Sequence, residues 1–194
     1  MSNNSTPYDL LIGVGTLWVA PTGTAMPALS AAPSSSWRDL GETDDGVKIS
    51  KTQNIEEFGS DQRTGKVKAV RTEEGLTIEA NLQKGTLENL ADVINGIVTT
   101  VAPGTGTIGT KTMNMHAGPI VQEFAFLFRA FSPYGDFPAQ YYVPRGYFSG
   151  NVEMEYKKDG KTLIPASFEA LEDLNASTEA ERFGKYQAQS AAAL

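Results

Sequence analysis

The chain has 194 residues, with 23 acidic against 16 basic side chains, a net charge of −7 and no cysteine. Its length and hydrophobic content of 40% predict one domain with a substantial core, while the lack of cysteine excludes disulfides and thiolate metal sites. The acidic balance disfavours tight binding to nucleic-acid phosphates, and no segment approaches the roughly 18 apolar residues of a membrane helix.

The first half of the chain predicts short strands separated by turns. Leu10 to Ala20 is dense in Leu, Val and Trp and predicts the first strand. Thr22 to Ser36 is rich in Ala, Pro and Ser, which is typical of an extended linker or loop. Trp37 to Leu40 and Val47 to Ser50 predict two strands, and the Asp-Gly pair in Thr43 to Gly46 predicts a hairpin turn between them.

Charges of both signs lie close together from Gln53 to Arg71. One interpretation is a solvated loop followed by a strand with a charged face. The other is a subunit interface held by ion pairs between neighbouring copies. The candidate interface residues are Glu56, Glu57, Asp61, Arg63 and Lys66.

Two segments alternate strictly between apolar and polar residues, which predicts half-buried antiparallel strands with one face in water. In the first, Leu76 to Leu82 supply the apolar positions and Thr77, Glu79 and Asn81 the polar ones. In the second, Glu153 and Glu155 alternate with apolar residues within a strand predicted at Tyr147 to Lys158.

One helix is predicted, at Leu87 to Asn95, where apolar residues recur at spacings of three, four and seven. Thr86 is its expected N-cap and Gly96 its expected left-handed residue at the C-terminal end. A helix this short must pack on a sheet. After it, Ile97 to Val101 predicts a strand and Pro103 to Gly118 a long loop or hairpin, a length that usually serves function or assembly.

Val121 to Phe131 predicts the strongest core strand, because three phenylalanines alternate along it and can fill the space between two sheets. Strands at Tyr141 to Val143 and Lys161 to Leu171 complete the β pattern, with a two-residue hairpin turn at Asp159 and Gly160. Beyond Asp173, a docking arm and a disordered tail are both open, and Phe183 and Tyr186 favour the arm.

Catalytic chemistry has little support. Gly104, Gly106 and Gly109 match a dinucleotide-binding pattern, but no helical period follows them, so the match is attributed to chance. His116 is the sole histidine. Glu153 and Glu155 share a predicted strand face about 7 Å apart, which leaves a glycosidase as a rival interpretation. We expect no enzyme activity, no metal and no cofactor.

Taken together, these segments resemble the major tail tube protein of long, non-contractile-tailed (siphovirus-type) bacteriophages. The resemblance covers about Gly13 to Leu171. It rests on the opening strand GVGTLWVAPTGTAMP, the segment LGETDDGVKIS, the polar stretch IEEFGSDQRTGKVKAVRTEEGLTIEANL, the helix TLENLADVI and the later β segment GYFSGNVEMEYKKDGKTLIPASFEAL. The tail beyond Asn175 has no counterpart in that pattern.

The resemblance implies a mainly β fold of two packed antiparallel sheets with one short flanking helix, long loops and terminal arms. It divides the chain into an N-terminal arm (1–9), a β-sandwich domain with a helix at 87–95 (10–173) and a C-terminal arm or disordered tail (174–194). If the tail is an arm, Phe183 and Tyr186 are expected to bury against a neighbouring copy.

The implied function is structural. Hexameric rings would stack into a tube in the virion tail, assembled in the host cytoplasm with tape-measure, tail-tip and terminator proteins and without a membrane. DNA would pass through the lumen without specific binding, because an acidic polar face repels phosphate. The expected lumen residues are Thr77, Glu79, Asn81, Glu153 and Glu155.

Three rival interpretations stay open. A carbohydrate-binding β-sandwich would need Trp37, Tyr141, Tyr142 and Tyr147 exposed together as a platform. A hydrolase would use the two glutamates of the predicted strand. A tail terminator or the tube of a contractile tail would share the two-sheet architecture.

Overall fold

The computed structural model describes residues 15–156 and 158–191. This part of the chain is mainly β, with two antiparallel sheets and one α-helix, which confirms the predicted fold class. The larger sheet contains β1 (Thr16–Pro21), β2 (Arg38–Gly41), β3 (Thr43–Gly59), β4 (Lys66–Leu82), β7 (Phe124–Phe131), β8 (Pro138–Phe148), β9 (Ile164–Ala170) and β10 (Lys185–Ala188). The smaller sheet pairs β5 (Val98–Val101) with β6 (Thr110–Met113), and α1 spans Leu87–Ile94. The predicted N-terminal arm and the first residues of the predicted opening strand, 10–14, lie outside the described residues.

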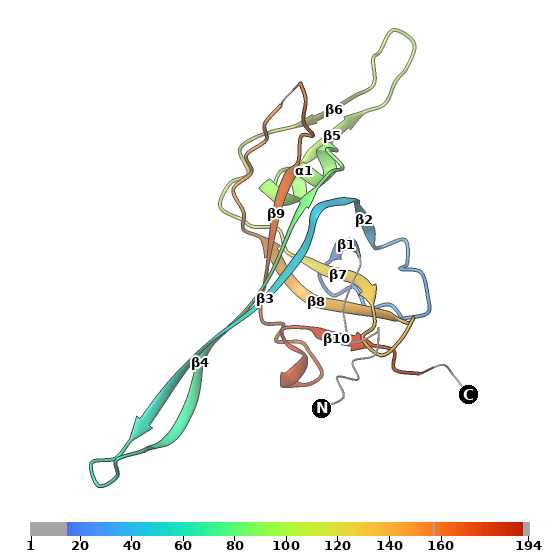
Figure 1. The fold of residues 1–194 in the computed structure, drawn as a ribbon. Coiled ribbons are helices and arrows are strands. Elements are labelled where there is room, and N and C mark those ends of the chain that lie inside the picture. Colours follow the sequence, from blue (N-terminus) through green and yellow to red (C-terminus); the bar gives the residue numbers. More distant parts are fainter. Residues whose placement is uncertain (1–14, 157, 192–194) are drawn as a thin grey trace.

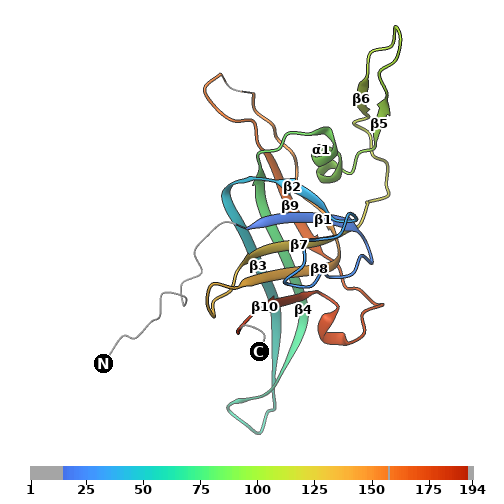
Figure 2. The ribbon, with the colours of Figure 1, turned by 90° about the vertical axis from the view of Figure 1, so that its right-hand side faces the viewer.

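The larger sheet folds over into two layers (Figure 2). Its strand order is β2-β1-β7-β8-β9-β4-β3, with β10 also paired to β8. Strands β2 and β3 follow each other in the chain but lie at opposite ends of this order, so the chain at Gly41 passes from one layer to the other. Gly41 has a φ of +90°, a conformation that glycine adopts without strain. The two packed layers are therefore parts of one continuous sheet.

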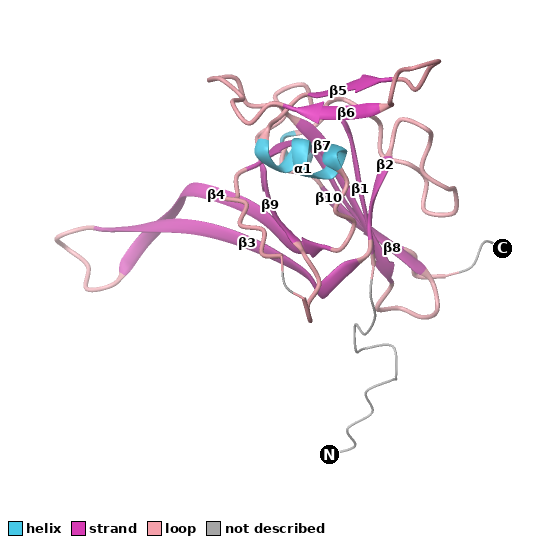
Figure 3. Ribbon diagram, turned by 90° about the horizontal axis from the view of Figure 1, so that it is seen from above, coloured by secondary structure: helices cyan, strands magenta, loops and turns pink. Residues whose placement is uncertain are grey.

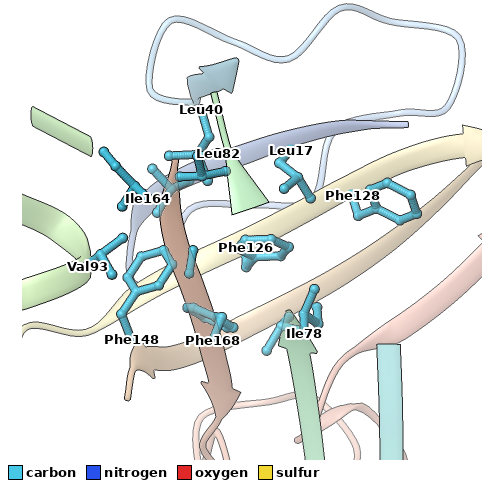
Figure 4. Packing of buried hydrophobic residues seen from close by; sticks show 13 residues of the cluster. Leu17, Leu40, Ile78, Leu82, Val93, Phe126, Phe128, Phe148, Ile164 and Phe168 are labelled. Atoms are coloured by element: carbon cyan, nitrogen blue, oxygen red, sulfur yellow. The ribbon is translucent and has the colours of Figure 1, made fainter. Parts of the chain in front are cut away.

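Aromatic rings fill the space between the layers (Figure 4). Phe126 of β7 stacks on Phe168 of β9 with ring centroids 4.8 Å apart, and Phe148 meets Phe168 edge to face at 5.4 Å. Ile78 of β4 and Leu17 of β1 belong to the same buried cluster. The predicted role of the β7 phenylalanines in the core is thus confirmed.

The other face of β7 is also covered, by the loop at residues 22–36. Ala125 and Leu127 are fully buried on this side and pack with Tyr142 in a second cluster. The Tyr142 hydroxyl donates a hydrogen bond to the Thr24 carbonyl at 2.8 Å. The segment that the sequence predicts as a linker or loop therefore packs on this face of the sheet and covers it.

The first predicted hairpin is wrong. Strands β2 and β3 do not pair with each other, because β2 pairs with β1 and β3 pairs with β4. Asp45 and Gly46 do have positive φ angles, of 60° and 78°, but they form a bulge in β3 where the register shifts between Asp44 and Val47. Positive φ suits a two-residue turn and a bulge equally well, so the local sequence does not distinguish them.

The strand predicted at Tyr147 to Lys158 is wrong beyond the end of β8. Residues 149–156 form no strand. Val152 and Met154 nevertheless pack against the core. Their alternation with the glutamates between them thus reflects burial of every second side chain, without the backbone pairing that defines a strand.

Helix α1 ends one residue earlier than predicted. The side chain of Thr86 accepts a hydrogen bond from the backbone of Asn89, which confirms the predicted N-cap. The left-handed residue at the C-terminal end is Asn95, with a φ of 62°, instead of the predicted Gly96. Asparagine is the residue after glycine that tolerates this conformation best. Val93 turns into the core between the layers.

A buried polar side chain ties α1 to the larger sheet. Asn89 has no exposed surface, and its amide donates to the carbonyls of Leu40 and Lys84, both at 2.9 Å. Arg38 of β2 donates to the Asn89 side-chain oxygen and to the Asp92 carboxylate. The helix is therefore held by directed hydrogen bonds as well as by apolar packing.

Two hairpins project from opposite ends of the body (Figure 1). Strands β3 and β4 pair along their length and continue beyond β9, which reaches β4 only as far as Thr77. We call this projecting part, residues 51–76, the arm; viewed from above, it leaves the body on the side away from β1 and β2 (Figure 3). The predicted loop at Gln53 to Gly65 is mostly strand, and the segment at Pro103 to Gly118 includes β6.

An acid-sensitive contact joins the segment before β7 to β8. Arg145 donates to both carboxylate oxygens of Glu123, at 2.7 and 2.8 Å, and these hydrogen bonds lower the pKa of Glu123 from its ordinary value of 4.5. Because the folded-state pKa lies below the unfolded value, this stabilisation is complete at neutral pH and is lost as the pH falls through the folded pKa.

We therefore expect Arg145→Met to flatten the fall in stability on acidification below the ordinary Glu pKa of 4.5. Urea midpoints measured at intervals from neutral pH to acid test this. Arg63→Met is the matched control, since Arg63 is exposed and forms no ion pair within the described residues. Parallel curves for wild type and Arg145→Met would contradict the expectation.

Candidate functional site

The outward face of β4 is polar across three paired strands. Thr77, Glu79 and Asn81 alternate with residues that point into the core. Their cross-strand partners on β3 and β9 are Ser50, Lys48, Asp44, Glu169, Ser167 and Pro165. We call this surface, made by these nine residues, the polar face. The structure thus brings three of the five predicted lumen residues together on one continuous surface.

Acidic groups outnumber basic ones on the polar face. Lys48 pairs with Glu79 at 2.7 Å, and both side chains are largely exposed. Glu169 accepts hydrogen bonds from the hydroxyls of Tyr147 and Ser149, both at 2.8 Å. The hydrogen bond to Glu169 raises the pKa of Tyr147. Lys48 and Glu169 were not predicted for this face, because only the strand register shows that they lie beside the β4 residues.

A shallow hollow of about 390 Å³ adjoins the polar face. Asp44, Glu79 and Asn81 line it together with Asn151 from the loop after β8. Among the described residues, no group of three histidine, cysteine, aspartate or glutamate side chains is arranged to hold a metal ion. The hollow is lined by polar groups, with carboxylates and amides among them.

The other two predicted lumen residues lie on the loop between β8 and β9. Glu153 and Glu155 are exposed there, in the segment that forms no strand. Lys161, from the returning half of this loop, reaches Asp44 of the polar face at 3.3 Å. The loop therefore lies next to the polar face without extending its strand ladder.

The five predicted interface charges lie at the outer end of the arm. Glu56, Glu57, Asp61, Arg63 and Lys66 are all exposed and form no ion pair within the described residues. The ion pairs of the arm lie nearer the body, where Glu74 meets both Lys51 and Arg71. Hydrogen bonds from these two cations lower the pKa of Glu74. The five outer charges are thus accessible to water or to another molecule.

The two predicted anchor residues contact their own subunit. Tyr186 of β10 stacks on Tyr141 of β8 with centroids 4.2 Å apart, and the Lys51 ammonium lies 4.8 Å from the centre of the Phe183 ring. Gly184 between them has a φ of +115°, and a Cβ there would lie 2.2 Å from the Tyr142 carbonyl oxygen. The C-terminal segment is therefore fitted closely to β8.

A family model described as "Phage tail tube protein" matches residues 1–189. The chain belongs to the phage tail tube protein family. No curated protein matches it. Membership makes it a structural component of the virion tail that assembles with copies of itself into a tube.

The aromatic residues of the rival carbohydrate-binding interpretation form no platform in this tail tube protein. Trp37 and Tyr142 are 4% and 8% exposed and pack edge to face. Tyr147 is tied to Glu169 by its hydroxyl. Burial of two of the four rings removes the flat exposed surface that sugar stacking needs.

The rival hydrolase interpretation required two glutamates on one face of a strand, and the structure does not have this arrangement. The spacing of about 7 Å assumed that Glu153 and Glu155 share one strand face. In the tail tube protein they lie in a loop instead.

No helix in the described part of the chain is long and apolar enough to cross a membrane.

Proposed function

We propose that the protein forms hexameric rings that stack into the tail tube of a long, non-contractile-tailed phage and conduct the genome into the host. Its partners in this role are further copies of itself, a tape-measure protein, and tail-tip and terminator proteins, with assembly in the host cytoplasm. Residues 1–9 act as an N-terminal arm of the domain, and the C-terminal segment, whose strand β10 pairs with β8, can add contacts to a neighbouring copy. The protein has no catalytic role and needs no cofactor.

The observation that carries this proposal is the polar face on a sheet with free edges. Among the described residues, the outer edge of β3 has no pairing strand at the end of the strand order, so the sheet can continue into a neighbouring subunit. Six such sheets joined edge to edge would close into a barrel without exposed edges. The polar face, with Glu153 and Glu155 beside it, would then line the lumen.

The acid excess on this face suits a conduit for DNA. Carboxylates repel phosphate, and a lumen without clustered cations offers no counterion release to hold the duplex. The polar face itself carries three acidic side chains, those of Asp44, Glu79 and Glu169, and one basic side chain, that of Lys48. The five outer charges of the arm, meanwhile, are placed to form ion pairs between subunits, which we propose as their role.

Electron cryomicroscopy of the polymerised protein tests the assembly. We expect hollow tubes of uniform width with six subunits in each ring and the polar face on the inner wall. Protein that stays monomeric at every concentration would overturn the proposed function. Tubes with Thr77, Glu79 and Asn81 on the outer wall would overturn the lumen assignment alone.

A charge-reversal variant tests the conduit. We expect tubes of Glu79→Lys, Glu153→Lys, Glu155→Lys to retain short fluorescent duplex DNA in a sedimentation assay, whereas wild-type tubes leave it in solution. The physical reason is that the new lysines attract phosphate and release counterions, so retention should also fall steeply as salt is added.

The control is Asp136→Lys, Glu179→Lys, which reverses two exposed acids away from the polar face. Its tubes should leave the DNA in solution. Equal retention by both variants would show that net charge alone decides, and would contradict a lumen built from these glutamates.

A further inference from the structure

A cleft of about 790 Å³ opens where the arm and β10 diverge below β9 (Figure 1). It lies between β4, β8 and residues 179–186 of the C-terminal segment. Leu76 and Ile78 of β4 and Tyr141 and Val143 of β8 form its floor, and all four belong to the main core cluster or pack against it. Cavities of about 300–1,000 Å³ are the usual size of binding sites in proteins. The cleft is therefore an opening into the core that is large enough to hold several side chains.

The strand edges beside the cleft have no partner in the described part of the chain. β9 pairs with β4 only as far as Thr77, which leaves residues 66–76 of β4 without a neighbour on that side. β10 pairs with β8 and with no other described strand. Natural β proteins usually cover free edges, because unpaired backbone groups bind other strands. The cleft therefore combines an apolar floor with backbone hydrogen-bonding groups on two sides.

A row of three aromatic rings joins the cleft to the start of β1. Tyr186 of β10 stacks on Tyr141 of β8 with centroids 4.2 Å apart, and the Tyr141 ring lies 6.2 Å from that of Phe128 in β7. Tyr186 is 43% exposed, so the row is open to water at the cleft. At the other end, a Cβ on Gly15 would lie 2.1 Å from Cε2 of Phe128. The described chain thus begins against the first ring of the row.

The distance from β1 to the cleft is short. Thr16, Arg129, Gln140 and Gln187 pair in that order across β1, β7, β8 and β10. Three strand spacings of about 4.8 Å give about 14 Å between the first and the last of these residues. Residues 8–14, which lie outside the described residues, span about 23 Å when extended at about 3.3 Å per residue. They are long enough to follow the row of rings from Gly15 into the cleft.

The composition of residues 8–14 fits the cleft. Most of them are apolar or aromatic, namely Tyr8, Leu10, Leu11, Ile12 and Val14. Asp9 is the only acidic residue between positions 1 and 14. The cleft is lined by four basic and three acidic side chains, and Nε of Arg182 is buried without a hydrogen-bond partner among the described residues. A buried donor is costly unless it is paired, and the carboxylate of Asp9 would pair this one.

We propose that residues 8–14 follow the row of rings and fill the cleft of their own chain, with their apolar side chains on its floor and Asp9 at Arg182. The occupant is the same chain because Gly15 tethers the segment beside the row, and a short tether gives an effective concentration in the millimolar range. The contact covers the free edge of β10 and leaves the outer edge of β3 open. It forms within a single subunit, so it goes beyond the proposed tube assembly and does not depend on it.

Cross-linking of introduced cysteines tests the contact, because the chain has no cysteine of its own. The test variant carries Leu10→Cys with Lys185→Cys, since Lys185 lines the cleft and is exposed. The control carries Leu10→Cys with Phe131→Cys, at an exposed position two residues beyond Arg129, within reach of the segment and outside the cleft. Both are treated with a short thiol-specific cross-linker at a dilution where light scattering shows single subunits. We expect mass spectrometry to find at least tenfold more linkage within one chain in the test variant.

The other outcomes would overturn the proposal. Equal linkage in the two variants would show that the segment is free of the cleft. Linkage only between chains of different size, seen when a size-tagged preparation is mixed in, would place the segment in the cleft of another copy. Because these measurements use single subunits, a wild-type chain that forms no tubes would overturn the proposed function alone.

Hydrogen exchange measures what the apolar residues contribute. Leu10→Asp, Leu11→Asp brings charges to an apolar floor and should release the segment, so the backbone amides of residues 185–188 should exchange at least tenfold faster than in the wild type. Asn3→Asp, Asn4→Asp adds the same charge outside residues 8–14 and should leave exchange in β10 unchanged. Circular dichroism confirms that both variants are folded. Unchanged exchange in the first variant, or equal acceleration in both, would contradict the proposal.

Discussion

Replacing Phe168 with alanine is expected to lower the free energy of unfolding by about 3–5 kcal/mol. Phe168 is 1% exposed and stands between the two layers, where it stacks on Phe126 and meets Phe148 edge to face. Removing the ring forfeits its transfer free energy and the aromatic contacts, and it leaves a cavity that the rigid strands fill only in part.

Urea unfolding followed by circular dichroism measures this loss. The matched control is Phe131→Ala, because Phe131 is 53% exposed at the end of β7 and should change stability by under about 1 kcal/mol. Assembly should follow stability, with Phe168→Ala forming few tubes at temperatures where the wild type assembles. Similar losses for the two variants would contradict the position of Phe168 as the centre of the core.

Replacing Asn89 with leucine is expected to cost about 3 kcal/mol, although the side chains are similar in size. The change removes both donors from the Leu40 and Lys84 carbonyls and takes away the acceptor of Arg38. Burial already lowers the pKa of Arg38, so its guanidinium is partly shielded from the water that would replace the lost partner. A buried polar group left without a partner costs more than the apolar leucine recovers.

Thermal and urea unfolding of Asn89→Leu test this expectation, with Asn151→Leu as the exposed control. The variant should also loosen the β5–β6 hairpin, because α1 contacts both β5 and β6. Hydrogen exchange should then rise in residues 98–113 before it rises in β7 and β8. A stability equal to that of the wild type would show that the helix is held by apolar packing alone.

The alternation at Leu76 to Leu82 located the polar face correctly on β4, because burial of every second residue is a property of the strand itself. Its neighbours on the face could not be predicted. Lys48 and Glu169 lie 31 and 90 positions from Glu79 in the chain, and only the register of β3 and β9 brings them beside it. Register depends on pairing over the whole sheet, which no local pattern specifies.

The difference between burial along one strand and pairing between distant strands also explains the wrong strand predictions. The arm strands carry little apolar alternation because neither face is buried, so their backbone pairing left no hydrophobic signal. The loop with Glu153 and Glu155 shows the reverse case, where alternation came from burial without pairing. Phe183 and Tyr186 lie in a segment whose strand β10 pairs with β8 of the same chain, and Tyr186 stacks on Tyr141, while their contact with a neighbouring copy stays a prediction.

By itself, the sequence determined the β class, the place and N-cap of α1, the core phenylalanines of β7 and the polar side of β4, because each depends on periodicity or on a local hydrogen bond. Tertiary structure decided that the two layers are one sheet, that Asp45 and Gly46 form a bulge, and that the arm and the β5–β6 hairpin project in opposite directions. These features depend on contacts between residues far apart in the chain. Such contacts exist only once the sheet has closed around its core.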